Sequence, residues 1–393
     1  MDQNLNKKIT GINTFQHDVP FLTHFNSVAL ALGTILKAPR AISKRGSALI
    51  RMFPGSNFVF RMTQNALDPK TVHCLKDDDV DESLRELGII HGYRRENNSV
   101  MQAIVTLFRY TNETMNFWTH ILPAVYLIWL LCTFFQTMPL VSDPYYLPFV
   151  CYMITLCVYP LMSSLAHAFS CLSLLATHVC FFMDYATLAL YSWGATLLYY
   201  NYMIPDAMVH STYASIYIPV AAVISILTTV MTCLSRTFPQ EWSSCKALRL
   251  SAFVIPFIWV SIPLFWRYFA YLFSNEAVST SLTYHGRQFI GVFLAAFFYA
   301  THIPERFIPG KFDFFGNSHN LLHIFGISAS FQQLKGVLVD MEERREFFES
   351  NQWHSSPFWV LLVTPLIVLS DFIVILYFTN QMKNQSLVVK KKN

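Results

Sequence analysis

Residues 304–323 read PERFIPGKFDFFGNSHNLLH, a polar turn that runs into an apolar segment carrying two histidines one helical turn apart. In a helix, His319 and His323 occupy positions i and i+4, so their imidazoles project from one face with Cβ atoms about 5–6 Å apart. This spacing suits two ligands of a single metal ion. Two ligands do not complete a site, however, and a pair of histidines at a membrane interface is the alternative interpretation of this motif alone.

The composition indicates a protein that crosses a membrane several times. Of the 393 residues, 53% are apolar, 16% are aromatic and only 13% are charged, whereas soluble domains contain about one quarter charged residues. The net charge of +4 comes without a basic stripe, so no nucleic-acid partner is expected. Most of the eight cysteines fall inside or beside apolar runs, and no disulfide framework is predicted.

Three regions are predicted along the chain. Residues 1–85 are expected to form a basic, flexible cytoplasmic tail, because their first 64 residues are rich in Lys and Arg and poor in acidic residues. A cleaved targeting segment is the alternative, but no small-residue cleavage pattern supports it. Residues 86–380 form the predicted polytopic helical membrane domain, and residues 381–393 a basic cytoplasmic C-terminal tail.

Eight apolar runs of about twenty residues follow one another after Glu113, each long enough to cross a hydrocarbon core of ~30 Å. Because irregular backbone cannot face lipid, the runs are predicted to be helices, and the fold class an all-α integral membrane protein. The runs lie near 117–137, 147–171, 179–201, 213–234, 250–272, 287–303, 318–338 and 357–379.

The distribution of Lys and Arg predicts the orientation. We call the side of the N-terminus side A; it also holds the segments after the second, fourth and sixth runs and the C-terminal tail. The opposite side is side B. Basic residues crowd the short segments of side A, whereas those of side B have few. Side A is therefore predicted to be cytoplasmic, with both termini inside the cell.

Five polar residues are predicted to lie at one depth near side A. Ser163 and His167 close the second run, Asp184 lies about one turn into the third, and His319 and His323 open the seventh. Ionisable groups inside a bilayer cost a few kcal/mol each unless they are paired or coordinated, which makes them functional candidates.

A tri-histidine zinc site is predicted from this convergence. Three imidazoles, from His167, His319 and His323, would hold Zn²⁺ and leave a fourth position open, the pattern of catalytic zinc. Asp184 would then hold the water that the metal activates, and Ser163 would hydrogen-bond to that water or to a substrate oxygen. The alternative is that the three histidines only donate to backbone carbonyls.

Other polar residues of the runs receive simpler interpretations. His120, His178 and His302 are each expected to be single hydrated histidines at the side A interface. Arg267 is expected to snorkel toward the headgroups of side B. Asp371 lies in the middle of the eighth run, and the sequence names no partner for it.

Six ordered motifs resemble those of the progestin and adipoQ receptor (PAQR) family, most of all its membrane progestin receptor branch. They are GIIHGYR at 88–94, TNETMNFWTH at 111–120, Ser163-x-x-x-His167, FMDY at 182–185, PERFIPGKFD at 304–313 and GxSHxxxH at 316–323. The resemblance covers residues 85 to 380. It implies a seven-helix core with a cytoplasmic N-terminus and an eighth C-terminal helix. It also implies zinc on His167, His319 and His323, with Ser163 and Asp184 beside it.

Two departures from the family pattern stand out. The long basic N-terminal extension lies outside the family core. The GIIHGYR motif is followed by Arg95-Glu96, where the family often has a proline.

The resemblance implies a membrane receptor for a steroid (progestin-like) or related lipid, with membrane lipids around it and G proteins as cytoplasmic partners. The alternative is an enzyme, because the family also resembles intramembrane ceramidases, which are zinc-dependent lipid amide hydrolases. A structural membrane protein with a vestigial metal site is a third possibility. The family implies the plasma membrane. The terminal Lys390-Lys391-Lys392-Asn393 resembles a dilysine signal, so the endoplasmic reticulum is the alternative location.

Overall fold

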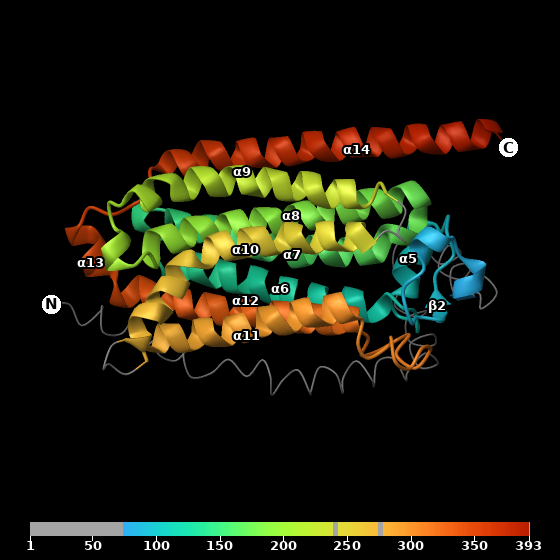
Figure 1. Cartoon of the computed structure of the whole chain (residues 1–393), viewed down its shortest axis with the longest axis horizontal. Helices are drawn as coiled ribbons and strands as arrows, with labels where there is room; N and C mark the ends of the chain where they lie inside the picture. Colours follow the sequence, from blue (N-terminus) through green and yellow to red (C-terminus); the bar gives the residue numbers. More distant parts are fainter. Residues whose placement is uncertain (1–73, 239–242, 274–277, 393) are drawn as a thin grey trace, which may run out of the picture.

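The computed structural model describes residues 74–238, 243–273 and 278–392, and within them eight long helices lie side by side (Figure 1). The all-α fold predicted from the apolar runs is confirmed. The eight helices are α6 (Thr114–Thr137), α7 (Leu147–Phe169), α8 (Leu174–Tyr202), α9 (Thr212–Ser235), α10 (Ser243–Leu272), α11 (Thr280–Thr301), α12 (Ser318–Glu343) and α14 (Thr364–Lys392).

Shorter elements gather at the two ends of the bundle. The end with α5 and β2 is side A, because α6 begins there, and the end with α13 is side B (Figure 1). These elements are β1 (Leu75–Lys76), β2 (His91–Tyr93), α5 (Val100–Thr106), α13 (Arg345–Ser350) and a π-helical turn (Trp359–Val363). Single 3-10 turns cover Asp77–Asp79, Glu82–Leu84, Pro144–Tyr146, Ser170–Leu172 and Asp206–Met208.

Two of the eight helices are less apolar than the others. Among the described residues, α6, α7, α8, α9, α10 and α14 are long and apolar enough to cross a membrane, whereas α11 and α12 fall short of that composition. Both pack closely against each other, and α12 also packs against α6. The helix α12 buries Ser330, Gln333 and Asp340 in the interior of the bundle. These polar residues therefore do not face lipid, although they lower the mean hydropathy of the helix.

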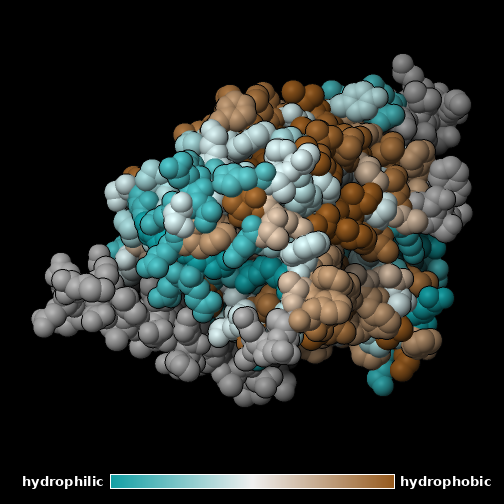
Figure 2. All heavy atoms as spheres, turned by 60° about the vertical axis from the view of Figure 1, so that its left-hand side comes forward, coloured by the Kyte–Doolittle hydropathy of each residue, from teal (hydrophilic) through white to brown (hydrophobic). Residues whose placement is uncertain are grey.

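The surface fits a membrane-spanning bundle. Figure 2 brings the end that carries α13 forward, and it shows hydrophilic residues over this end and a hydrophobic flank beyond it. The interior is filled with aromatic side chains; Tyr152, Tyr199 and Trp193 are at most 1% exposed. The helix α14 lies on the outside, packed on α8 and α9. Its buried Asp371 lies beside Thr229 of α9, but among the described residues the Thr229 hydroxyl and Asp371 Oδ1 have no hydrogen-bond partner.

A small β cap closes side A and explains the first and fifth motifs. The strands β1 and β2 pair antiparallel, and the backbone amides of Ile90 and His91 donate to Asp313 at 3.0 and 2.9 Å. Gly88 adopts φ +81°, and a Cβ there would come within 2.5 Å of the Glu305 carbonyl oxygen. Only glycine allows this approach, so residues 88–94 are docked on residues 304–313.

The ends of the chain relate to the predicted regions as follows. The first 73 residues of the predicted N-terminal tail lie outside the described residues. The structured part begins before the predicted boundary, because β1 lies within residues 1–85. The predicted C-terminal segment is described through Lys392 as the end of α14. The division of the chain into a tail, a membrane domain and a second tail stays a prediction.

Candidate metal centre

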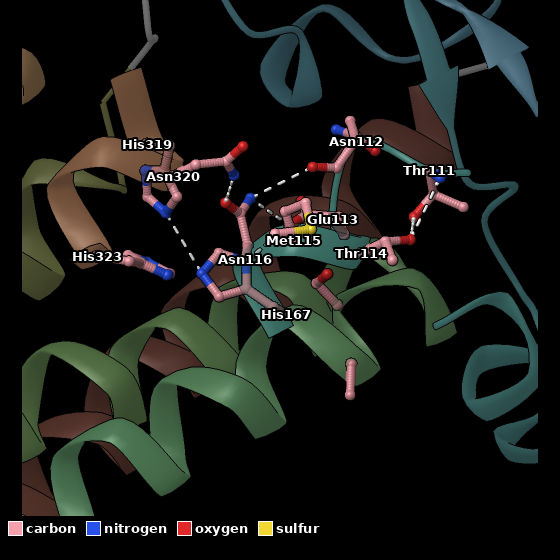
Figure 3. A network of polar contacts seen from close by, with 12 residues as sticks. Thr111, Asn112, Glu113, Thr114, Met115, Asn116, His167, His319, Asn320 and His323 are labelled. Carbon is pink, nitrogen blue, oxygen red and sulfur yellow. Dashed lines mark hydrogen bonds and ion pairs between the residues drawn. The ribbon is translucent and has the colours of Figure 1, made fainter. Parts of the chain in front are cut away.

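Three imidazoles meet at the side A end of the bundle. His167 comes from the last turn of α7, and His319 and His323 come from the first two turns of α12. Their ligand nitrogens all lie within 4.8 Å of one another, and the Nε2 atoms of His167 and His319 are 3.3 Å apart (Figure 3). The residues predicted from spacing are thus brought together, and this buried group can hold a metal ion.

Hydrogen bonds from α6 orient two of these imidazoles. Glu113 Oε2 lies 2.7 Å from Nδ1 of His167, and the Thr119 hydroxyl lies 3.0 Å from Nδ1 of His323. Each bond occupies the nitrogen that faces away from the cluster. Fixing the outer nitrogen of a metal-binding imidazole sets its tautomer and its direction, so the inner nitrogens are presented to the centre of the cluster.

Glu113 is itself held by a chain of amides. The Asn116 side chain donates to Glu113 Oε2 at 3.0 Å, and Asn320 donates to Asn116 Oδ1 at 2.6 Å (Figure 3). The chain ties the start of α6 to the start of α12. Sequence reasoning assigned no role to Glu113, Asn116 or Thr119. The available signal was their three-residue spacing, which places them on one face of the first turns of a helix.

Arg94 joins the β cap to the end of α7. Its buried guanidinium donates to the carbonyl oxygens of His167 and Ala168, and to the Ser170 hydroxyl at 3.0 Å. The last carbonyls of a helix have no partner inside the helix. Arg94 therefore satisfies them and fixes the backbone on which His167 stands.

Ser163 and Asp184 lie beside the histidines, as predicted. Ser163 is one turn before His167 on α7, and Asp184 of α8 is buried next to Ser163 and close to His167. Among the described residues, Asp184 Oδ1 is buried without a hydrogen-bond partner. A buried carboxylate oxygen without a hydrogen bond is energetically costly. Asp184 Oδ1 can therefore accept a hydrogen bond from a water molecule or a ligand.

The expectation for the other side A histidines was wrong in two cases. His120 is buried and stacks on His323, with ring centroids 3.7 Å apart and an interplanar angle of 8°. His178 is also buried. His302 is partly exposed and lies 3.9 Å from Glu305. Hydropathy placed these residues at the interface but could not show that neighbouring helices cover them.

A pocket of about 890 Å³ leads from side A to the cluster. Its lining includes His319, Glu113, Arg94, Phe181 and His302. His319 is the cluster member that lies on the pocket wall and is only partly buried. A small molecule that enters the pocket therefore reaches the imidazole of His319.

Comparison with known proteins gives a consistent result. The family model of haemolysin-III-related proteins matches residues 108–334. A membrane progestin receptor gamma of Mus musculus is 40% identical over 283 residues, which are 72% of this chain and 85% of that protein. A membrane progestin receptor delta of Mus musculus is 38% identical over 71% of this chain and 82% of its own length. A membrane progestin receptor alpha of Homo sapiens is 29% identical over 78% and 88%.

The family match extends from just before α6 into α12, so it contains every residue of the histidine cluster and of the hydrogen bonds that orient it. The multi-pass membrane fold, the motifs and these relatives agree with one another. The chain belongs to the haemolysin-III-related family, which is the PAQR family, and the resemblance to membrane progestin receptors is confirmed.

Proposed function

We propose that this protein is a membrane receptor for a steroid (progestin-like) or related lipid, with a tri-histidine zinc site near the cytoplasmic face. One observation carries the proposal: three imidazoles, two of them buried and oriented by hydrogen bonds, converge in a chain that is 40% identical to proteins named membrane progestin receptors. The aromatic interior of the bundle suits a flat apolar ligand.

Zinc fits the residues present. Two ligands of a tetrahedral zinc ion, each about 2.0–2.1 Å from the metal, lie about 3.3–3.4 Å apart. The Nε2 atoms of His167 and His319 are 3.3 Å apart, and the outer nitrogens of His167 and His323 are already hydrogen-bonded. His167, His319 and His323 would hold the ion, which supplies Lewis-acid chemistry and a link between α7 and α12 when bound.

The receptor would work by a shift between two arrangements of the bundle. A ligand changes such an equilibrium only by the difference between its affinities for the two states. The histidine cluster ties α7 to α12, and Arg94 ties α7 to the β cap. A ligand that moves these helices would therefore move the side A surface, where G proteins would respond.

A second candidate function is the hydrolysis of a lipid amide, and the buried Oδ1 of Asp184, which has no hydrogen-bond partner among the described residues, favours it. Asp184 is placed to accept a proton from an attacking water. Ser163 beside it is placed to hold a carbonyl oxygen of the substrate. The pocket that reaches His319 gives a substrate access to this position.

The test uses the purified full-length protein in lipid nanodiscs. Metal content, progestin binding and ceramide hydrolysis are measured for the wild type, His319→Ala, Asp184→Asn and the control His354→Ala, whose histidine is exposed near side B. Binding that survives His319→Ala, with no turnover in the wild type, supports the receptor with a structural metal. Turnover that both site variants abolish supports the hydrolase. A wild-type protein that purifies without zinc from zinc-replete cells contradicts the zinc site in either function.

The proposed location is the plasma membrane, with the endoplasmic reticulum as the alternative raised by the terminal lysines. Retrieval by a dilysine signal depends on the distance of the lysines from the C-terminus, whereas attraction to headgroups depends only on their charge. A few uncharged residues added after Asn393 should move the protein to the cell surface if retrieval operates. An unchanged distribution in the imaged cells would dismiss the dilysine reading.

A further inference from the structure

Three cations from the end of α9 and the start of α10 line the pocket that leads to His319. Arg236 directly follows α9, and Lys246 and Arg249 lie in the first two turns of α10. None of the ion pairs that the described residues form with one another involves these three side chains. This side of the pocket therefore carries positive charge without a direct ion pair among the described residues.

Arg236 is the most unusual of the three because it is 9% exposed. Its guanidinium donates to the Tyr185 hydroxyl at 3.2 Å and lies over the Phe181 ring, 4.4 Å from the centroid. Its Nε is buried without a hydrogen-bond partner among the described residues. A buried guanidinium is ordinarily paired with a carboxylate. Here the ring and the phenol hold the group in place and leave a donor unused.

Arg249 is held in a similar way from the next helix. Its Nε donates to the Ser235 hydroxyl at 3.0 Å, and its guanidinium lies 5.5 Å from the centroid of the Tyr185 ring. Both guanidinium groups thus contact Tyr185, and both are fixed by neutral partners. Lys246, one turn earlier on α10, is exposed and adds a third charge at the mouth of the pocket.

The deep carboxylates of the pocket are already engaged elsewhere. Glu113 is bonded to His167 and Asn116, and Glu305 accepts from the backbone and the hydroxyl of Ser318. The remaining acidic residues of the lining belong to the β cap and the segment after it, and they are Asp77, Asp81, Glu82, Glu86 and Glu96. The charged lining residues from the end of α9 and from α10 are all cations, whereas the cap side contributes acidic residues together with Arg85 and Arg94. An anion is therefore favoured at the α9–α10 side.

We propose that Arg236, Arg249 and Lys246 form a binding site for a phosphate group, beside the histidine cluster and in the same pocket. Guanidinium groups match the oxygens of phosphate, and donors that are fixed in advance lose little entropy on binding. The site lies at the end of α9 and the start of α10, the depth of lipid headgroups, so the phosphate of a membrane lipid is the favoured source and free phosphate the other.

This inference rests on the proposed function in one respect only. The lipid that the phosphate site holds is expected to approach His319, because the site and His319 line the same pocket. Phosphate binding itself requires no metal. His319→Ala should therefore lose metal and keep phosphate binding. The failure of one proposal is thus measured separately from the failure of the other.

The experiment compares two double variants of the full-length protein. Protein in phosphatidylcholine nanodiscs is titrated with phosphatidic acid or with inorganic phosphate, and binding is followed by native mass spectrometry and by the thermal midpoint. Arg236→Gln with Arg249→Gln should weaken binding by about tenfold or more, because charge-assisted hydrogen bonds are lost. The control, Arg306→Gln with Lys311→Gln, removes two exposed charges from side A outside the pocket and should change it less than about twofold.

Each outcome is decisive. Phosphatidic acid alone binding to the wild type identifies a lipid headgroup, and inorganic phosphate binding equally well identifies free phosphate as a source; both support the site. Equal losses of binding in the two double variants would show that only the general charge of side A matters, and they would overturn the proposed site. A wild type that binds neither probe would overturn it as well. If the pocket double variant does not fold, judged by the loss of its cooperative thermal transition, Lys246→Gln alone should still weaken binding while the thermal midpoint without ligand stays unchanged.

Discussion

Two buried polar clusters lie near opposite ends of α12, and they are built in different ways. The histidine cluster, His167, His319 and His323, lies at side A. The carboxylate cluster, Asp340 with Arg267, Ser281 and His285, lies near side B. At 1.5 Å per residue, His323 and Asp340 are about 25 Å apart along the helix.

The carboxylate cluster pairs its main charges within the protein. Arg267 donates to Oδ2 of Asp340 and forms an ion pair with Oδ1, each at 2.9 Å, and Ser281 donates to Oδ2 at 2.6 Å. Among the described residues, Oδ1 of Asp340 and Nε2 of His285 have no hydrogen bond of their own. His285 lies 3.4 Å from Oδ2 of Asp340 and passes close to α12 because residue 336 is glycine; a Cβ there would come within 2.5 Å of the imidazole. The snorkelling expected for Arg267 is therefore wrong, because a buried carboxylate holds it.

The histidine cluster has the opposite character. Its members turn nitrogens toward one another, and among the described residues the nearest carboxylate bond, from Glu113, goes to the outer nitrogen of His167. Imidazole nitrogens that converge on one position are what a metal ion requires. Burial of polar groups is therefore common to both clusters, and they differ in charge: the carboxylate cluster pairs a carboxylate with a guanidinium, whereas the histidine cluster brings three imidazoles together.

The largest expected effect is the loss of metal from the histidine cluster. Alanine at His167, His319 or His323 should each lower metal affinity by more than the roughly 10–100-fold typical of an outer-shell partner. The thermal midpoint should fall as well, since metal bound only to the folded state stabilises it. Elemental analysis and thermal unfolding measure both. Full metal occupancy in any variant would remove that residue from the site.

The next effect concerns stability at the other cluster. Arg267→Met leaves Asp340 buried and uncompensated, which should cost about 3–5 kcal/mol of stability. Adding Asp340→Asn should restore most of the loss, and neither variant should change the metal content. Denaturation in detergent gives the energies. A loss of stability below about 1 kcal/mol would show that the Arg267–Asp340 pair contributes no more than an exposed ion pair.

A smaller effect is expected when the orienting group is changed and the ligands are kept. Glu113→Gln retains the shape of the side chain but removes the charge that holds His167, so metal affinity should fall roughly 10–100-fold. Glu346→Gln, an exposed residue of α13, is the matched control. Competition with a chelator measures the affinity. Equal affinities in the two variants would show that the hydrogen bond to His167 has no role in metal binding.

The last prediction is that three glycosylation sequons stay unmodified, and it tests which end of the bundle faces the cytoplasm. Asn97, Asn112 and Asn384 head Asn-x-Ser/Thr sequons on side A, so all three should remain unmodified. A sequon placed between residues 139 and 143, on side B, should be glycosylated and serves as the positive control. Treatment with a glycosidase reads both by gel mobility. A glycan on Asn112 would invert the orientation, and one on Asn384 alone would remove a span.

The sequence by itself determined the class of fold and the candidate ligands. Apolar runs of about twenty residues can only be helices in lipid, and the four-residue spacing of His319 and His323, repeated by Ser163 and His167, fixes which residues share a helix face. Successive spans cross the bilayer in opposite directions, and this alternation predicts that these four residues and Asp184 lie at one depth. Each of these inferences needs only local periodicity and counting, and the structure brings the five residues together.

Tertiary structure alone decided which helix faces meet. It gave Asp340 as the partner of Arg267, Glu113 as the partner of His167, and the stacking of His120 on His323. The members of these pairs lie 54 to 203 residues apart in the sequence, with no pattern that joins them. Hydropathy reports how deep a residue lies, but the rotation of one helix against another follows from packing along its whole length. That packing decides whether a buried charge is satisfied or left to bind a ligand.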